Sequence, residues 1–201
     1  MIVQFAGALP PSARPYGIRL PGDRPATSTC RQISAMIPDH ILKPDSVLND
    51  ISARSKKHCL EILSELLAHG TPSIPGEEIF SKLAERERLG TTGLGNGIAF
   101  PHCRFTGIDA SHGALLKLSE AIEFDSPDDE HVDLVFGLMV PQEITDQHRE
   151  EVAEITALLN DPVVCARLRR AGTGTELYEA FLAARHAGNA RFGTRSALRR
   201  S

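Results

Sequence analysis

Residues 132–140 read Val-Asp-Leu-Val-Phe-Gly-Leu-Met-Val. Nearly every position in this run is apolar, whereas a strand with one face in water alternates apolar and polar residues. Such a run is typical of a strand that lies inside a sheet and is covered on both of its faces. We therefore expect a central sheet with helices packed against it.

Helical patterns surround this strand in the sequence. Residues 55–69 place six apolar side chains at helical spacing before Gly70. Pro75 is expected to open a second helix. The apolar positions expected to be buried in that helix are Ile79, Phe80, Leu83 and Leu89. Further helices are expected over 147–159, 162–170 and 174–185, and short strands over 97–100 and 114–118. The alternation of helices and strands predicts a single α/β domain.

The two ends of the chain differ from its centre. Six of the 13 prolines fall within residues 1–38, where no helical or strand period persists, so we predict a disordered N-terminal extension there. Residues 187–201 are predicted to form a flexible basic tail. The folded domain is then expected over residues 40–185.

The charge is unevenly distributed along the chain. The 22 basic and 26 acidic side chains give a net charge of -4, but residues 32–184 alone carry 13 basic and 25 acidic side chains. An acidic centre repels nucleic acid, whose binding needs a basic surface, so we expect no nucleic-acid partner. The arginine-rich ends could contact RNA or anionic lipid, but we interpret them as loose tails.

Apolar runs and cysteines indicate the compartment. A transmembrane helix needs a run of roughly 18 apolar residues, which the sequence lacks, so we expect no membrane insertion. The apolar residues 2–9 lack the basic segment of a secretory signal. The cysteines at positions 30, 59, 103 and 165 form no C-x-x-C pair and fit no zinc template. We expect free thiols, no metal site and a cytoplasmic location.

The glycine-rich segment before His102 is the strongest candidate for chemistry. Residues 90–104 read Gly-Thr-Thr-Gly-Leu-Gly-Asn-Gly-Ile-Ala-Phe-Pro-His-Cys-Arg. The segment lacks the Gly-Lys-Ser/Thr of a Walker loop and the spacing and strand-to-helix order of a dinucleotide fingerprint. The lysine, catalytic loop and metal-binding aspartate that accompany a kinase glycine loop are also missing. A flexible loop followed by a short strand, with Pro101 fixing the backbone, would hold an imidazole at a strand end beside backbone N–H groups.

That arrangement suits phosphoryl transfer. A neutral imidazole nitrogen is a competent nucleophile toward phosphorus, and Arg86 and Arg104 flank it as possible donors to phosphoryl oxygens. No metal or cofactor is required if the donor already carries an activated phosphoryl group. The residues alone leave a second interpretation open, because a histidine after proline at a strand end can be purely structural.

The same segment resembles the phosphorylation-site signature of enzyme IIA proteins of the bacterial phosphotransferase system, mannitol/fructose class, and is most similar to their nitrogen-regulatory branch. The shared pattern is a Gly-Asn-Gly turn, an aliphatic-Ala-aliphatic strand and then Pro-His with a small residue after it. The resemblance extends to Arg86-Glu-Arg-Leu-Gly90, to Phe124-Asp-Ser-Pro-Asp128 and to about residues 40–185 as a whole. It implies a central mixed β-sheet flanked by helices.

The resemblance also implies roles for individual residues. His102 falls on the phosphorylated histidine, which carries the phosphoryl group on its tele nitrogen. Arg86 falls on an active-site arginine, and His148, at the start of a helix, falls on a second histidine that orients the phosphoryl group. The residues expected to cradle the phosphate are Thr91, Thr92, Gly95, Asn96 and Arg104.

The function implied by the resemblance is that of a cytoplasmic phosphocarrier. His102 would accept a phosphoryl group from an HPr-like phosphocarrier protein, and the phosphorylated protein would act mainly in regulation. Two alternatives stay open. One is a fructose- or mannitol-type transport subunit that passes phosphate to a separate IIB partner. The other is a binding module that controls a transporter or sensor kinase without being phosphorylated.

Overall fold

The computed structural model describes residues 41–197, and it describes side-chain burial for residues 41–186. The predicted N-terminal extension, residues 1–38, lies outside the described residues. In chain order the strands are β1 (Leu42–Ile51), β2 (Gly93–Gly95), β3 (Ile98–Ala99), β4 (His102–Phe105), β5 (His112–Ile122) and β6 (Val132–Pro141). The helices are α1 (Lys56–Gly70), α2 (Gly76–Arg88), α3 (Asp146–Leu159), α4 (Pro162–Arg170) and α5 (Gly174–Ala197).

The strands of the described part form one mixed sheet with β6 inside it. Their order is β1-β5-β6-β3-β2, and β4 pairs with β6 beyond the end of β3. β6 runs antiparallel to β5 and parallel to both β3 and β4. The predicted fold, a mixed sheet built around the apolar run 132–140 and flanked by helices, is confirmed.

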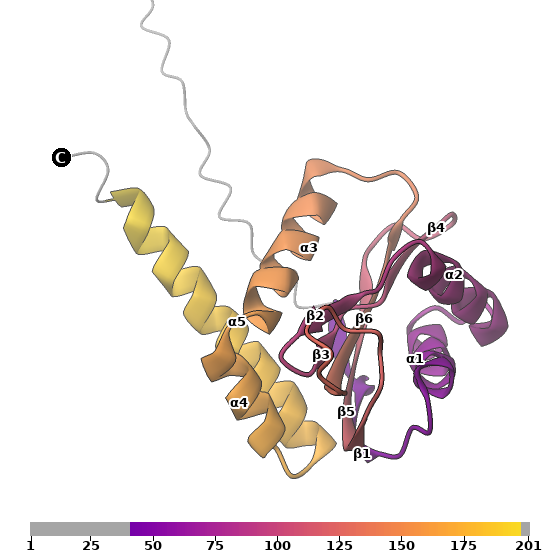
Figure 1. Ribbon diagram of the computed structural model, residues 1–201. Coiled ribbons are helices and arrows are strands. Elements are labelled where there is room, and N and C mark those ends of the chain that lie inside the picture. The colour runs from indigo at the N-terminus through magenta and orange to yellow at the C-terminus, as the bar shows by residue number, and fades with distance from the viewer. Residues whose placement is uncertain (1–40, 198–201) are drawn as a thin grey trace, which may run out of the picture. The chain divides into compact units, whose positions relative to one another are not determined.

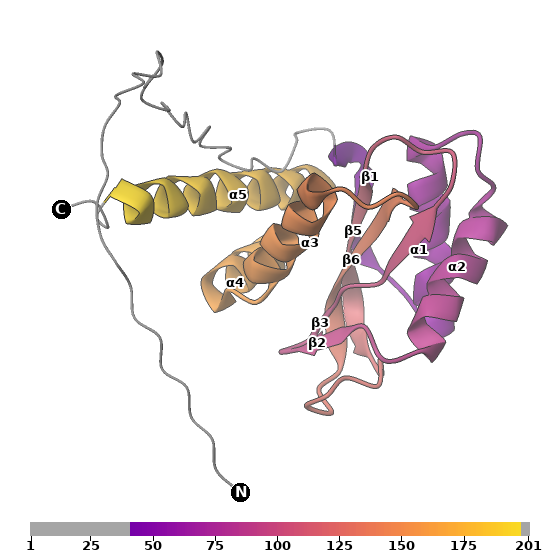
Figure 2. The same ribbon diagram turned by 90° about the horizontal axis from the view of Figure 1, so that it is seen from above.

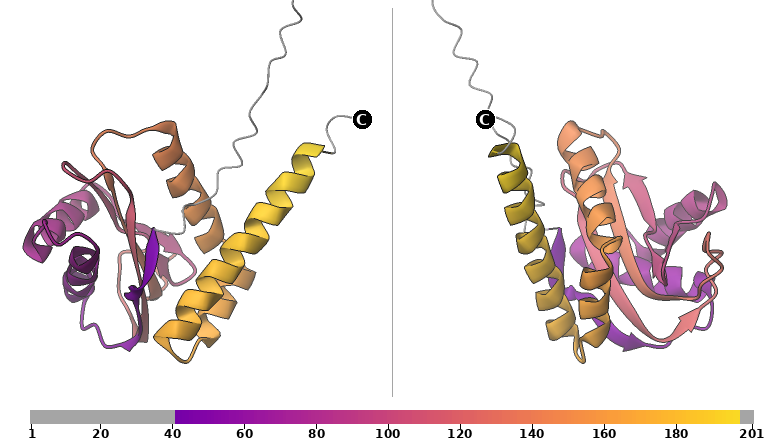
Figure 3. Two further views of the ribbon diagram at one scale, coloured as in Figure 1. Left: turned by 180° about the vertical axis from the view of Figure 1, so that it is seen from behind. Right: turned by 60° about the vertical axis from the view of Figure 1, so that its left-hand side comes forward.

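Helices cover both faces of this sheet. Helices α1 and α2 lie on one face, and α3, α4 and α5 lie on the other (Figures 1 and 3). Successive side chains of β6 point to opposite faces, as in any strand. Val135 and Met139 therefore enter the core beneath α1 and α2, whereas Phe136 and Leu138 enter the core beneath α3 to α5. The view from above shows the sheet between these two layers (Figure 2).

The helices begin where the sequence supplies caps. The side chain of Ser55 accepts a hydrogen bond from the backbone N–H of His58 at the start of α1, and Asp161 caps α4 in the same way. Helix α2 follows Pro75, with Glu77 and Glu78 in its first turn, near the positive end of the helix dipole. The predicted helices over 55–69, 147–159 and 162–170 are each confirmed to within a residue.

Two elements differ from the sequence-based predictions. The sequence analysis does not predict β1, because Pro44 and Asp45 interrupt its apolar pattern. β1 is the edge strand of the sheet, where a proline is tolerated. Its register with β5 shifts between Leu42 and Val47. Helix α5 continues to Ala197 rather than ending at 185. Residues 187–197 therefore lie in α5 and not in the predicted flexible tail over 187–201; this stretch contains no proline, and its three alanines and two arginines favour helix.

The expected burial of Leu89 is wrong, because this side chain is 83% exposed. Ile79 and Leu83 define the inward face of α2, and both are buried. The next position on that face, four residues after Leu83, is Glu87. Leu89 caps the helix and points away from the core.

A substitution at Gly137 would test the close contact between β6 and α1. A Cβ at this position would lie 2.6 Å from Leu63 Cδ2 and 2.7 Å from Leu63 Cγ. We predict that Gly137→Ala lowers the free energy of unfolding by about 1–3 kcal/mol, because a packed core resists an added methyl group. Urea denaturation would measure this change.

A matched control is Gly172→Ala, whose nearest neighbour would be Glu176 Oε2 at 3.5 Å. This variant should stay within about 0.5 kcal/mol of wild type. The cost of Gly137→Ala should also shrink in a Leu63→Ala background, where the space is vacated. Equal costs in both backgrounds would contradict the contact.

Candidate functional site

His102 is the first residue of β4, immediately after Pro101. Along β4, His102 is half-buried, Cys103 buried, Arg104 exposed and Phe105 buried. His102 and Arg104, two residues apart, therefore share one face of the strand, while Cys103 points into the core. His102 was expected at the end of a strand over 97–100, whereas the structure places it at the start of β4, a separate strand.

A hydrogen bond fixes the protonation of the His102 ring. Nδ1 lies 3.0 Å from the carbonyl oxygen of Phe100. A carbonyl oxygen can only accept, so Nδ1 carries the proton and donates it. In the neutral ring the lone pair is then on Nε2, which makes Nε2 the nucleophilic nitrogen.

The surroundings keep this ring neutral. Burial lowers the pKa of His102 below its usual value of 6.5, and the positive charges of Arg86 and Arg104 lower it further. The bond to Phe100 and the charge of Glu87 oppose the shift without cancelling it. The neighbouring thiol is not a competing nucleophile at neutral pH, since burial raises the pKa of Cys103 to about 12.

Arg86 reaches the same site from the last turn of α2. Its Nη1 donates to the carbonyl oxygen of Gly90 at 2.9 Å. The chain after Gly90 runs antiparallel to the chain before His102: Gly93 pairs with Ala99 in the β2–β3 hairpin. The positive charges of Arg86 and Arg104 both act on the His102 ring, so the two arginines lie near it.

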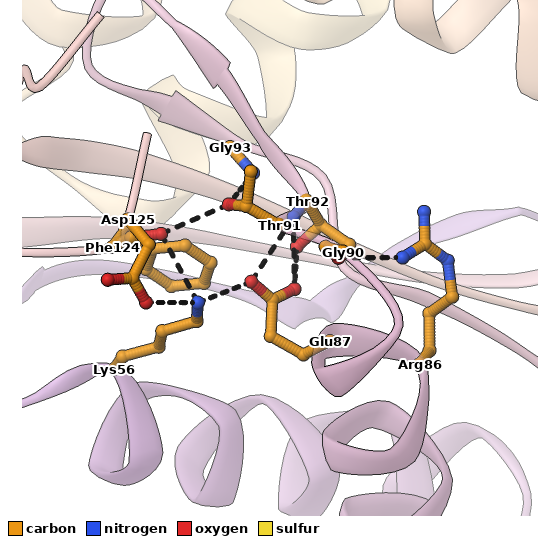
Figure 4. A network of polar contacts seen from close by, with 9 residues as sticks. All are labelled: Lys56, Arg86, Glu87, Gly90, Thr91, Thr92, Gly93, Phe124 and Asp125. Atoms are coloured by element: carbon orange, nitrogen blue, oxygen red, sulfur yellow. Dashed lines mark hydrogen bonds and ion pairs between the residues drawn. The ribbon is translucent and has the colours of Figure 1, made fainter. Parts of the chain in front are cut away.

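Thr91 and Thr92 are engaged by the protein itself. The Thr91 hydroxyl donates to the Phe124 carbonyl oxygen at 3.2 Å and accepts from the Gly93 N–H at 3.1 Å. Thr92 is buried, and both its backbone N–H and its hydroxyl donate to the Glu87 carboxylate (Figure 4). The donors of Thr92 are therefore engaged with Glu87, and the phosphate-cradling role of Thr92 stays a prediction.

Gly95 and Asn96 form the tip of the β2–β3 hairpin, away from His102. Both have positive φ, 85° and 55°, as a tight turn requires. The Asn96 N–H donates to Asp128 at 2.7 Å, and its carbonyl oxygen accepts from Arg169 at 2.6 Å. Ile98 pairs with Leu134 of β6 and His102 with Leu138, four residues further along the strand. At the rise of a β-strand, this places the hairpin about 13 Å from His102 along β6. Asn96 is thus anchored by Asp128 and Arg169, and the expected phosphate contacts of Gly95 and Asn96 stay predictions.

His148 occupies the first turn of α3. Its Nδ1 accepts from the backbone N–H of Thr145 at 3.2 Å, and its own N–H donates to the Thr145 hydroxyl, which together form a capping box. The proton of the neutral ring is then on Nε2, which is left as a donor. Among the described residues, no hydrogen bond joins His148 to His102. The loop that leads to α3 and His148 starts beside the end of β4: the Gln142 N–H donates to the carbonyl oxygen of Phe105 at 2.7 Å.

The geometry combines a nucleophile with cationic groups. His102 offers a neutral ring with one free nitrogen, and Arg86 and Arg104 add two positive charges that suit the oxygens of a transferring phosphoryl group. Sequence reasoning missed Glu87 and Lys56, which meet behind this site. The signal for Glu87 was its place at the inward position of α2, where a charge needs a partner.

Comparisons with known proteins identify the family of the chain. Residues 40–184 match the family described as "Phosphoenolpyruvate-dependent sugar phosphotransferase system, EIIA 2". A nitrogen regulatory protein of Pseudomonas aeruginosa is 41% identical over 141 residues, which cover 70% of this chain and 92% of that protein. The nitrogen regulatory protein of Escherichia coli K12 is 38% identical over 148 residues, covering 70% and 90%.

Solved structures share the fold. The nitrogen regulatory protein IIA-Ntr from Neisseria meningitidis superposes with a TM-score of 0.66 at 31% identity, covering 70% of this chain and 96% of that one. The mannitol IIA of Escherichia coli gives a TM-score of 0.57 at 22% identity, covering 69% and 97%. Within residues 41–197, none of the helices is long and apolar enough to span a membrane.

The charge of Arg86 should be visible in the titration of His102. Arg86→Gln removes a positive charge that lowers the pKa of His102, so we predict that this pKa rises. Arg88→Gln, on the same turn of α2, is the control and should leave the pKa unchanged. Titration of the imidazole by NMR would measure both. An unchanged or lower pKa in Arg86→Gln would show that the guanidinium does not face the ring.

Proposed function

The chain belongs to the EIIA 2 family of the phosphoenolpyruvate-dependent sugar phosphotransferase system, and on that premise we propose that His102 accepts a phosphoryl group from an HPr-like phosphocarrier protein. The observation that carries this proposal is the bond from His102 Nδ1 to the Phe100 carbonyl oxygen. It holds the ring in one orientation and leaves the lone pair on Nε2, the tele nitrogen. Burial and two arginines keep that nitrogen unprotonated.

The transfer step needs no cofactor. The Nε2 lone pair of His102 attacks phosphorus of the phosphorylated donor, a bond forms between Nε2 and phosphorus, and the bond from phosphorus to the donor nitrogen breaks. The electron pair of the broken bond returns to the donor. Arg86 and Arg104 stabilise the negative oxygens during transfer. His148 Nε2–H contributes a further hydrogen bond once the donor has docked.

The relatives support a regulatory role. This chain covers 92% of the Pseudomonas aeruginosa nitrogen regulatory protein and 90% of the Escherichia coli K12 one. A sugar-specific EIIABC component of Escherichia coli is 31% identical over 63% of this chain, but the match covers 20% of that protein. We therefore propose a cytoplasmic regulator whose partners, a transporter or a sensor kinase, respond to phosphorylation. A phosphoryl group adds a charge of up to about -2, which changes such a surface by electrostatics.

Phosphate uptake is the direct test. The protein is incubated with enzyme I, an HPr-like phosphocarrier and phosphoenolpyruvate, and its intact mass is measured. We predict a gain of one phosphate that is lost in His102→Ala and kept in His69→Ala, an exposed histidine on α1. Because burial and the two arginines lower the pKa of His102, uptake should fall off at a lower pH than the usual imidazole value of 6.5 would give. Absence of uptake with every carrier would favour the binding module that acts unphosphorylated.

His148 should affect the rate of uptake but not its extent. We predict that His148→Gln slows phosphoryl transfer by about tenfold to a hundredfold, because one oriented donor is lost, while the final mass gain stays the same. His58→Gln is a matched control. His58 is the third residue of α1, and its Nδ1 accepts from a backbone N–H as that of His148 does. Equal rates in the two variants would exclude His148 from the site.

A further inference from the structure

Glu87 is an enclosed carboxylate next to Arg86 in the sequence. Its side chain is 7% exposed. Its two oxygens accept from the Thr92 N–H at 3.2 and 3.1 Å and from the Thr92 hydroxyl, and Lys56 supplies the opposite charge (Figure 4). A carboxylate removed from water is stable only when its charge is matched in this way.

Lys56, the first residue of α1, is itself held in place. Its Nζ donates to Asp125 Oδ2 at 2.9 Å and to the Phe124 carbonyl oxygen at 3.3 Å, and it lies 5.0 Å from the centroid of the Phe124 ring. Burial lowers the pKa of Lys56, but its bonds to Glu87 and Asp125 outweigh burial, and the pKa is raised. Because Asp125 is 73% exposed and Glu87 is not, the Lys56–Glu87 pair is the less screened of the two.

Hydrogen bonds connect Glu87 to the His102 ring. The Thr92 carbonyl oxygen accepts from the Phe100 N–H at 2.8 Å. The Phe100 carbonyl oxygen in turn accepts from His102 Nδ1 at 3.0 Å. The position of Thr92 therefore sets the position of Phe100, and Phe100 sets the orientation of the ring. Glu87 fixes the first of these three residues.

The connection between α2 and β2, residues 89–92, is held by two neighbouring residues of α2. Arg86 donates to the Gly90 carbonyl oxygen, whereas Glu87 holds Thr92, two residues further along. Residues 86 and 87 thus fix both ends of the short connection that separates α2 from β2. A shift of Thr92 would move both the cationic group and the nucleophile of the site.

We propose that Glu87, paired with Lys56, is a positioning residue for phosphoryl transfer to His102. The inference rests on the proposed function of His102. Glu87 does not meet the phosphoryl group, because its oxygens are taken by Thr92 and Lys56; it acts through Thr92 and Phe100 on the ring. Since Glu87 is enclosed, its loss should slow the transfer step and leave docking of the donor unchanged.

Transfer kinetics test this proposal. With a phosphorylated HPr-like carrier as donor, we expect Glu87→Gln to lower the maximal single-turnover rate by about tenfold or more, with the half-saturating donor concentration within about twofold of wild type. Thr92→Val, which keeps the charge of Glu87 and removes one of its anchors, should lower the rate to a smaller extent. Glu85→Gln is the matched control: Glu85 is exposed on the same helix, pairs with Lys82 and should leave the rate unchanged.

The His102 ring gives a second reading that needs no donor. ¹⁵N chemical shifts report which ring nitrogen carries the proton. We expect the Nδ1–H form in wild type and in Glu85→Gln, and a mixture of both tautomers in Glu87→Gln and Thr92→Val. A wild-type rate in folded Glu87→Gln, or an unchanged tautomer in both variants, would overturn the proposal. If wild type itself takes up no phosphate, the proposed function fails, and the tautomer alone decides whether Glu87 positions the ring.

Discussion

A strand that is apolar toward both faces must be covered on both, and β6 imposes this requirement on the rest of the fold. Phe136 and Leu138 demand cover from α3 to α5, and Val135 and Met139 demand it from α1 and α2. Gly137 lets Leu63 of α1 approach the strand closely. The rigid position of β6 then fixes β4, whose pairing His102↔Leu138 places the candidate nucleophile. The site is thus positioned by the core and not by a mobile loop.

Two groups of charges act at the site, the arginines Arg86 and Arg104 and the enclosed pair Glu87 and Lys56. Toward solvent, Arg86 and Arg104 favour a neutral imidazole and an anionic ligand. At the connection 89–92, Lys56 pairs with two carboxylates, the enclosed Glu87 and the exposed Asp125. The charge of Glu87 raises the pKa of His102 and so acts against the two arginines, but pairing with Lys56 lets this enclosed carboxylate keep its charge and hold Thr92.

How much the sequence predicted depended on whether the deciding interaction was local. The helix at 55–69 and the strand at 132–140 follow from spacing and apolar runs, and the segment ending in His102 was recognisable residue by residue. Strand β1 was missed because its pairing with β5, and not its own pattern around Pro44, makes it a strand. The glycine-rich run was expected to hold phosphate at Gly95 and Asn96. The structure uses these residues for a hairpin turn anchored by Asp128 and Arg169, partners distant in sequence.

Arg86 can serve the loop and a phosphoryl group at once. A guanidinium carries several N–H donors in a planar fork, and Gly90 occupies one of them. The charge of Arg86 also acts on the His102 ring, and because Phe100 closes Nδ1, a phosphorylated partner would have to reach Nε2. A lysine at this position would lack the planar fork, because its ammonium is a compact charge without the bidentate geometry of a guanidinium. Under the proposed function, the double task of holding Gly90 and meeting the oxygens on Nε2 would therefore favour arginine over lysine.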